Sequence, residues 1–297
     1  MEALVQKIFG PGFFLWNSVW ISLVFGLTCP LVGVYLVVRR LVFMGVALPQ
    51  VSSCGIAFAF ALQGWGLLPH AHESAGEQTL AFIGSTVFTL AAILILSLLA
   101  RRGRGSVEAR IGTAYVLAGA WSILLLVKNP IGEHGLLDLL KGEIISISDF
   151  ELAVTAGSFA LVVAILWLFK KEFLLVSFDR EMAVSLKKNV LVWDSFLFLL
   201  IGLTISMAVL GVGPLVTFGF LLLPPLTAHL FARNMRQFAL LASGLGGAAA
   251  LAGFILAYRL DLPVGATDVA LLGVLYTVAF TVKRLFLSRR AQPAAAV

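Results

Sequence analysis

The side chains that could do chemistry are few in this sequence, and most of them stand inside apolar runs. There is no G-x-x-x-x-G-K-[ST] segment, the loop with which many ATPases hold phosphate. No Ser/His/Asp or H-E-x-x-H arrangement indicates hydrolytic catalysis either. The two cysteines, Cys29 and Cys54, lack the C-x-x-C spacing of zinc or redox sites. We therefore expect this chain to have no enzyme activity and to bind no cofactor of its own.

One polar patch could line a conduit. Gln50, Ser52, Ser53 and Cys54 interrupt an otherwise apolar stretch. In lipid such groups mostly bond to neighbouring helices, so a packing role and a pathway-lining role both remain open. Cys54 could also ligate a soft metal, although a buried free cysteine more often behaves as a small hydrophobe.

A second candidate for the pathway is the pair Pro224–Pro225. Two successive prolines remove two backbone donors and should kink or break their helix. Such irregularity is tolerated at membrane depth where it faces protein or a cavity. The pair could therefore line a pathway, or serve packing alone.

Ionisable residues are scarce inside the apolar segments. A gradient-driven transporter usually carries carboxylates or histidines within the membrane, because a buried ionisable group is costly unless it works. Here the candidates are Asp194, Asp268 and His229, and all three fall near segment ends. This pattern favours a passive conduit that a partner gates.

The elements that must position these residues are membrane-spanning helices. Of the 297 residues 60% are hydrophobic and only 12% are charged, and the mean hydropathy is +1.03. A soluble domain carries about 25% charged residues, so most of this chain must be surrounded by lipid. Since a span needs about 20 mostly apolar residues, we predict an all-α membrane protein with about nine transmembrane helices. They are expected at residues 13–38, 41–65, 79–100, 111–127, 152–169, 194–211, 214–232, 237–258 and 264–282.

The basic residues predict the orientation of these helices. With the N-terminus outside, all 21 Lys and Arg residues except Lys7, Lys128, Lys141 and Arg259 fall on the inside. Lys and Arg in short loops favour the cytoplasm, so we predict the N-terminus out and the C-terminus in. The same bias explains the net charge of +6 without a nucleic-acid partner.

Three connecting stretches carry further signals. The outside loop 66–78 contains His70 and His72, which together with an adjacent glutamate could capture a metal ion or face solvent. The outside stretch 128–151 alternates apolar with acidic positions and predicts a short helix lying on the surface. The inside stretch 170–193 mixes apolar and charged residues too densely for a linker, so we expect a structured cytoplasmic excursion.

Four stretches resemble the zinc-, manganese- and iron-type ABC permeases, the membrane subunits of metal importers. RRLVFMGVALPQVSSCGIAFAFAL (39–62) is similar to the arginine-led second helix of that family, and LLDLLKGEIISISDFEL (136–152) to its outside helix. VSFDREMAVSLKKNVLVWDSFLFLLIGLTISMAVLGVGPLVTFGFLLLPPLTAHL (176–230) resembles its most characteristic region, and DLPVGATDVALLGVLYTVAF (261–280) the start of its last helix. The matches stand in order and spread over nearly the whole chain.

The resemblance implies the ABC importer permease fold and a homodimer with the substrate pathway between two copies. It also implies a cytoplasmic ABC ATPase, on which ATP and Mg²⁺ would bind, and an extracytoplasmic solute-binding protein. The ATPase would contact a coupling element at about 172–192. The residues that match this element are Phe178, Asp179, Arg180, Glu181, Met182 and Ala183.

The character of this element fits such a role, although an amphipathic interfacial helix would look similar. A coupling helix needs a charged face for electrostatic complementarity and an apolar face to transmit movement. The charged residues are Asp179, Arg180 and Glu181, and the apolar ones are Phe178, Met182 and Val184.

The sequence departs from the family where a metal ligand is expected. In the family's second helix an aspartate follows the glycine and a histidine comes four residues later, so both side chains share one face and can hold a divalent cation. Here Val46 and Gln50 occupy those positions, and Pro49 stands in place of a serine. Valine cannot ligate a metal, and glutamine offers only a neutral carbonyl. The conduit could therefore pass a chelated metal, pass another solute, or use ligands elsewhere.

Together these observations predict a multi-pass permease of the cell (inner) membrane, within an ATP-driven importer for zinc, manganese or iron or for a metal complex. One transmembrane domain is expected over 1–290, followed by a disordered tail at 291–297. The alternatives are a self-contained secondary transporter or channel without an ATPase, and a membrane scaffold or receptor subunit that no longer conducts.

Overall fold

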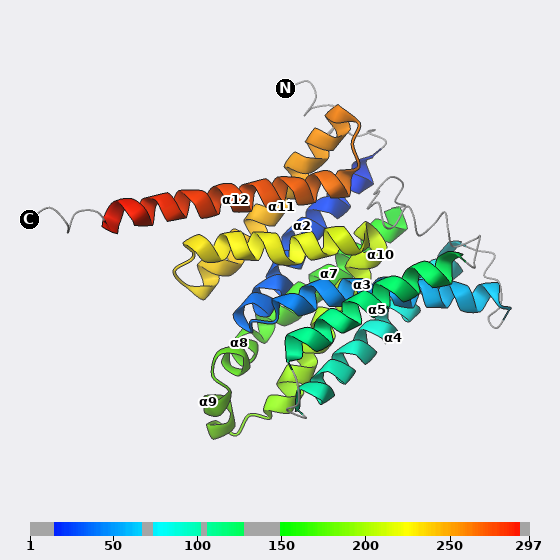
Figure 1. Ribbon diagram of the computed structural model, residues 1–297, viewed down its shortest axis with the longest axis horizontal. Helices are drawn as coiled ribbons and strands as arrows, with labels where there is room; N and C mark the ends of the chain where they lie inside the picture. The colour runs from blue at the N-terminus through cyan, green and yellow to red at the C-terminus, as the bar shows by residue number, and fades with distance from the viewer. Residues whose placement is uncertain (1–14, 67–73, 102–105, 128–148, 292–297) are drawn as a thin grey trace, which may run out of the picture.

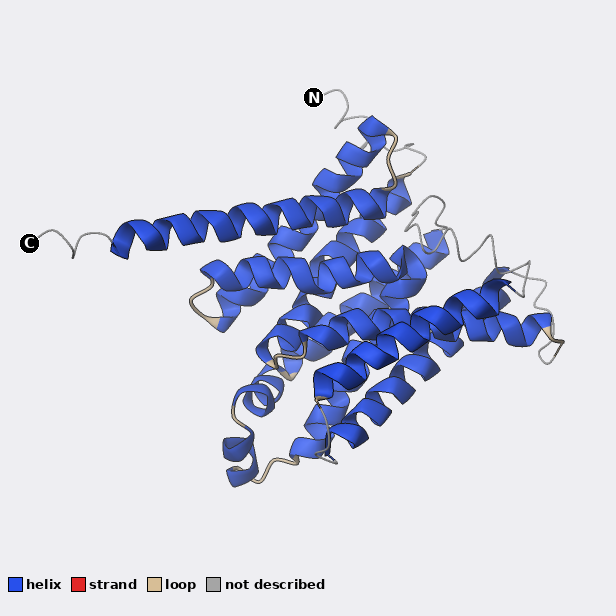
Figure 2. Ribbon diagram, in the orientation of Figure 1, coloured by secondary structure: helices blue, strands red, loops and turns tan. Residues whose placement is uncertain are grey.

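The computed structural model of the protein describes residues 15–66, 74–101, 106–127 and 149–291, which form helices and no strand (Figure 2). The helices, labelled in Figure 1, are α2 (Trp16–Val38), α3 (Val42–Gly64), α4 (Ser74–Arg101), α5 (Val107–Val127), α7 (Asp149–Leu168), α8 (Lys170–Phe178), α9 (Arg180–Ser185), α10 (Val190–Phe231), α11 (Met235–Leu260) and α12 (Val264–Ala291). The prediction of an all-α membrane protein is confirmed over the described residues.

Polar residues between the apolar runs fix where several helices begin and end. Asn189 and Asn234 cap α10 and α11, because each side-chain oxygen accepts a hydrogen bond from a backbone amide in the first turn. Asp261 ends α11 in the left-handed conformation, with φ 52°, from which a helix cannot continue. These signals are local, which is why the helix boundaries lie close to those predicted from the sequence.

Helices α2 and α10 form the centre of the bundle, and α5 and α12 lie at its margins (Figure 1). Helix α2 packs against α7, α10 and α11, while α10 also contacts α3, α4 and α12. In the most apolar window of each helix, 67% of α2 but only 17% of α5 and 22% of α12 is buried within the chain. The apolar faces that the chain itself leaves uncovered must contact lipid or another apolar partner.

Helix α10 is broken near its middle. Its 42 residues would be about 63 Å long as one helix, about twice the hydrocarbon thickness of a bilayer. Gly213 has φ 78° and ψ 167°, which are not helical, and Pro214 follows it with no backbone donor. The two parts of α10 correspond to the predicted segments 194–211 and 214–232.

Seven of the described helices are long and apolar enough to cross a membrane, or up to eight if the bent pair Leu152–Leu168 and Lys170–Phe178 forms one span. That number counts α10 once. The predicted number of nine spans, and the orientation of the termini, therefore remain predictions.

The connecting stretches agree only partly with the sequence analysis. The predicted loop 66–78 is too long, because α4 already begins at Ser74. Residues 128–148 of the predicted surface helix lie outside the described residues, as do His70, His72 and all but the first residue of the tail 291–297. The stretch 170–193 is structured, as predicted, and contains α8 and α9.

Glycines let α2 approach its neighbours closely. A Cβ atom added to Gly26 would lie 2.7 Å from the carbonyl oxygen of Gly246 in α11. A Cβ atom added to Gly33 would overlap the carbonyl oxygen of Leu221 in α10 and lie 3.0 Å from Pro225. Small residues at such crossings are a common basis of helix association in membranes. The position of α2 thus depends on two residues that have no side chain.

We predict that Gly33→Ala lowers the apparent unfolding temperature of the purified protein in detergent. The added methyl group would push α2 away from α10, and overpacking of this kind costs about 1–3 kcal/mol. The matched control is Gly273→Ala in α12, where a Cβ atom meets nothing within 4 Å. That change should leave stability equal or slightly higher, because alanine favours a helix. Equal unfolding temperatures for the two variants would contradict the close packing of α2.

Candidate functional site

The predicted coupling element folds into α8 and α9 at one end of the molecule (Figure 1). Helix α8 follows α7 after a bend of 67°. The carboxylate of Asp179 accepts a hydrogen bond from the backbone N–H of Met182 at 2.8 Å and so caps α9. Ala183 is fully buried and packs with Val176 of α8 and Val190 of α10. Asp179 therefore fixes where α9 begins, and Ala183 holds α9 against α8 and α10.

The outer surface of α9 is both apolar and charged. The side chains of Phe178, Met182 and Val184 are 66%, 52% and 62% exposed, and Glu181 is exposed beside them. Arg180 is the first residue of α9. Large exposed apolar side chains grouped with charges are typical of a surface that binds another protein.

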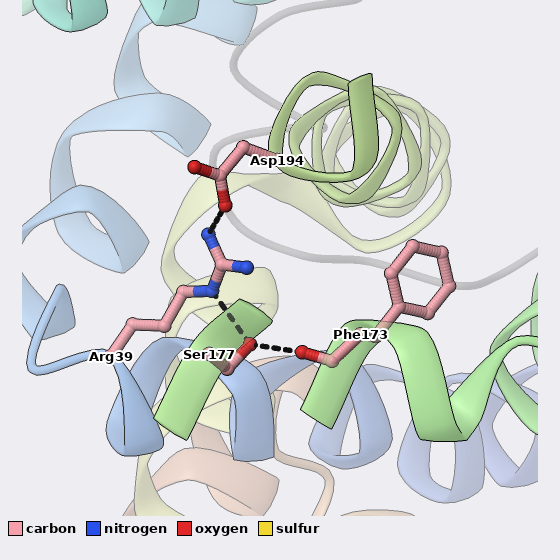
Figure 3. A network of polar contacts seen from close by, with 4 residues as sticks. All are labelled: Arg39, Phe173, Ser177 and Asp194. Atoms are coloured by element: carbon pink, nitrogen blue, oxygen red, sulfur yellow. Dashed lines mark hydrogen bonds and ion pairs between the residues drawn. The ribbon is translucent and has the colours of Figure 1, made fainter. Parts of the chain in front are cut away.

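Arg39, at the end of α2, joins α8 and α10 (Figure 3). Its Nη1 forms an ion pair with Oδ1 of Asp194 in α10 at 2.7 Å, and its Nε donates a hydrogen bond to Oγ of Ser177 in α8 at 2.9 Å. The Ser177 hydroxyl in turn donates to the backbone oxygen of Phe173. The guanidinium carbon also lies 5.4 Å from the ring centre of Phe198. One side chain thus holds the ends of three helices together.

This ion pair is largely withdrawn from solvent. The side chains of Arg39 and Asp194 are only 9% and 17% exposed. Removing one partner of a buried pair leaves an uncompensated charge, which costs about 3–5 kcal/mol. The geometry therefore resists separation of α2 from α8 and α10.

Aromatic rings add an apolar layer beside the ion pair. Phe169 and Phe173, from the α7–α8 region, pack against Trp193 and Phe196 of α10 with ring centres 5.4–5.9 Å apart. Tyr35 of α2 lies 6.2 Å from Phe173, which is fully buried. Aromatic pairs at these distances, several of them edge-on, stabilise more than burial alone. Helix α8 is therefore anchored to the transmembrane core. Helix α9 packs on it through Ala183, and its opposite side is exposed.

The polar patch of α3 divides into buried and partly exposed residues. Ser53 is 2% and Cys54 6% exposed, and Cys54 packs with Val51 and with Ala118 of α5. Within one copy of the chain, the structure therefore places these two residues in helix packing. Gln50 is only half-buried, beside Gly119 of α5.

Pro224 and Pro225 are buried in the second part of α10. Pro225 lies where Gly33 of α2 passes, so it takes part in the close helix contact described above. A pathway-lining role for the two prolines remains a prediction.

Two sets of buried polar contacts were not predicted, although Ser52 and Asp268 were both noted in the sequence. The hydroxyl groups of Ser52 and Ser85 share a hydrogen bond, and Ser85 Oγ lies 3.4 Å from the backbone oxygen of Ser206. This cluster connects α3, α4 and α10. Asp268, expected near a segment end, is fully buried in α12, with Ser22 Oγ of α2 at 3.5 Å from its Oδ2.

No group of three or more His, Cys, Asp or Glu side chains within the described ranges is arranged to hold a metal ion. His229 is exposed and its ring packs near Phe238. The histidines of the loop 66–78 lie outside the described residues. A metal site in this loop therefore stays a prediction.

An apolar helical bundle with seven helices, or up to eight, long and apolar enough to cross a membrane is the architecture of a multi-pass membrane protein. Residues 13–283 match the ABC 3 transport family, and the chain belongs to that family. The predicted resemblance to metal-type ABC permeases is confirmed, and so is the location in a membrane.

Relatives of the chain match it over nearly its full length. It is 29% identical over 286 residues to an uncharacterized membrane protein of Synechocystis sp., covering 96% of this chain and 95% of that protein. It is 26% identical over 279 residues to the manganese import system permease protein ScaB of Streptococcus gordonii, covering 93% and 95%. Its fold is similar to that of PsaBC from Streptococcus pneumoniae in complex with Fab, with a TM-score of 0.80, 24% identity and coverage of 94% and 95%.

We predict that Arg39→Ala destabilises the protein by about 3 kcal/mol, because Asp194 loses its buried ion-pair partner. The neighbouring Arg40→Ala is the matched control. Because Arg40 is exposed, this variant should lose little stability. The double variant Arg39→Ala/Asp194→Ala should lose less stability than the sum of the losses of the two single variants. The measurement is the apparent unfolding temperature in detergent, and additive losses would contradict a coupled pair.

Proposed function

We propose that this chain is the membrane-spanning permease subunit of an ATP-driven importer for a metal ion or a metal complex. The observation that carries the proposal is α9, an exposed apolar and charged helix anchored through α8, Arg39 and Asp194 to the transmembrane core. The chain has no phosphate-binding loop, so a separate ABC ATPase would hydrolyse ATP and bind Mg²⁺. Membership of the ABC 3 transport family supports this partner.

The arrangement suggests how the ATPase would drive the permease. Closure of the ATPase would displace α9, and Ala183 would carry the displacement to α8 and the start of α10. Arg39 would pass the displacement on to α2, because its guanidinium bonds to both α8 and α10. Since α2 and α10 form the centre of the bundle, tilting them would alternate the pathway between outward-open and inward-open states. An extracytoplasmic solute-binding protein would deliver the cargo.

We infer that the chain crosses the membrane nine times, with the N-terminus outside. The inference counts the two parts of α10 separately at Gly213 and takes α7 as a span that ends at its bend into α8. An odd number of spans is what the distribution of basic residues requires. It also puts α8 and α9 on the cytoplasmic side, where an ATPase could reach them.

We further infer a homodimer with the pathway between the two copies. Val46 and Gln50, four residues apart on one face of α3, are only half-buried in the single chain, and Phe43 beyond them is 55% exposed. The neighbouring helix α5 is mostly uncovered as well. A second copy would cover these faces and enclose Val46 and Gln50 in a conduit.

The cargo that this conduit suits is a metal of the class carried by manganese import permeases such as ScaB, moved as an ion or as a complex. A valine and a neutral amide at the centre of the conduit hold a bare divalent cation weakly, because such ions prefer imidazole and carboxylate ligands. Because Val46 and Gln50 replace the family's aspartate and histidine, the conduit suits a metal that is bound by a chelator, or an ion that passes without being held.

One observation favours a second function, a gradient-driven carrier without an ATPase. Asp268 is fully buried, its Oδ1 has no hydrogen-bond partner among the described residues, and Gly253 leaves just enough room for it. Carboxylates at membrane depth often serve ion coupling. Uptake by the chain alone in liposomes, lost in Asp268→Asn, would select this function over the ATP-driven one.

We predict that Glu181→Arg abolishes association with the cognate ATPase and the ATP hydrolysis that depends on it. The charge lies on the exposed outer face of α9, so its reversal would oppose the partner without unfolding the helix. The measurement is complex formation and ATP hydrolysis in liposomes that contain both proteins.

The matched control is Glu108→Arg, which also reverses an exposed glutamate in the first turn of a helix on the predicted cytoplasmic side. It should bind the ATPase like the original chain. If both variants bind equally well, α9 is not the docking site.

We predict that Val46→Asp/Gln50→His creates a manganese site that the original chain lacks. The two new ligands would share one face of α3, so each dimer would bring four ligands to the conduit. Manganese binding by the detergent-purified chain is the measurement, with at least about a tenfold gain in affinity expected. Unchanged binding would mean that these two positions do not face one conduit.

A further inference from the structure

A groove of about 900 Å³ lies between α2, the α7–α8 bend and the first turns of α11. Its walls are mainly apolar, with Leu31 of α2, Leu166 of α7 and Leu240 of α11 among them. Leu240 is 74% exposed, so the groove opens towards the surroundings of the bundle. A groove of this kind on a membrane-embedded surface is filled by apolar chains.

One end of the groove is basic. Lys170 and Lys171 line it from the start of α8, and Arg236 lines it from the first turn of α11. Among the described residues none of the three forms an ion pair, and the ammonium group of Lys170 lies over the ring of Trp167 at 4.9 Å. Three cationic side chains without acidic partners, beside an apolar groove, favour the binding of an anionic ligand.

The backbone adds to the attraction for an anion. Helix α11 begins at Met235 within the groove, and the first N–H groups of a helix have no partner inside it. These groups and the helix dipole favour negative charge at this end. The side chain of Asn234 accepts from the N–H of Gln237 and its backbone oxygen from that of Phe238, so the N–H groups of Met235 and Arg236 are the ones that a ligand could use.

We propose that this groove is a binding site for an anionic phospholipid. Its phosphate would lie among Lys170, Lys171 and Arg236, and an acyl chain would run along Leu31, Leu166 and Leu240. The basic end is the predicted cytoplasmic end, where the leaflet carries anionic lipids and each Lys or Arg contributes about 1 kcal/mol of attraction. A phospholipid matches both ends of the groove, whereas a second copy of this basic chain would bring further positive charge.

The site would tie the lipid to the moving parts of the protein. Helix α8 forms one wall of the groove and leads directly to α9, while α2 and α11 form the others. A lipid bound there would hold α8 against α11. The lipid site depends on the groove, on the membrane location and on the orientation inferred above, and not on the cargo or the ATPase.

The test is native mass spectrometry of the full-length chain, extracted from nanodiscs that contain equal amounts of phosphatidylglycerol and phosphatidylcholine. We expect the original chain to retain phosphatidylglycerol selectively. The variant Lys170→Gln/Lys171→Gln/Arg236→Gln should bind phosphatidylglycerol about 100-fold more weakly. Each removed charge contributes about 1 kcal/mol, which is a factor of about five in affinity. The control Arg40→Gln/Lys187→Gln/Arg284→Gln removes three exposed charges outside the groove and should bind normally.

A second variant separates lipid binding from charge. Ala239→Phe would fill the groove from α11 and displace the acyl chain, whereas Ala248→Phe on an exposed part of the same helix should not. Equal retention of the two lipids by the original chain, or unchanged binding by both groove variants, would overturn the proposal. So would disulfide cross-linking of Ala239→Cys to a second copy, because the groove would then be a protein interface.

Discussion

The arrangement of this permease depends on one guanidinium group. Arg39 lies where α2 ends, and its bonds to Ser177 and Asp194 reach α8 and α10, the helices on either side of α9. Separating a buried charge from its partners costs several kcal/mol, so the three helix ends are held together. The aromatic rings around Phe173 fill the space beside the pair and make the junction rigid. The rest of the molecule is a bundle of apolar helices, several of which approach each other closely at glycines, and this junction is where a movement of α9 could enter it.

Much of this fold could be predicted from the sequence, because lipid imposes a simple rule on the chain. A span needs about 20 apolar residues, and caps such as Asn189 and Asn234 act locally. The element around α9 could be predicted as well, since its charges interrupt an apolar sequence. The break at Gly213 was visible only as a boundary between two apolar segments, because neither composition nor periodicity reports a φ angle.

The contacts between helices could not be predicted in the same way. Arg39 was noted as a basic residue and as the start of a family-like stretch, but not as one half of an ion pair, because its partner Asp194 is 155 positions away. The packing of Cys54 against Ala118 of α5 could not be predicted either, because a helix wheel does not show which helix lies opposite. Asp268 lies near the start of α12, as predicted, but its burial was not predicted, because it depends on Gly253 of α11 leaving room for the carboxyl group. Each case depends on which helices become neighbours, and no local pattern encodes that.

We propose that ATP-driven movement of α9 reaches the transmembrane helices through Arg39. The most direct measurement is the amount of metal taken up per ATP hydrolysed, in liposomes that contain the permease, its ATPase and its binding protein, for the original chain and for Arg39→Gln. We expect the variant still to bind the ATPase and hydrolyse ATP, but uptake per ATP should fall by at least about tenfold, equivalent to about 1.4 kcal/mol of lost coupling. An unchanged ratio would show that the movement reaches the pathway by another route.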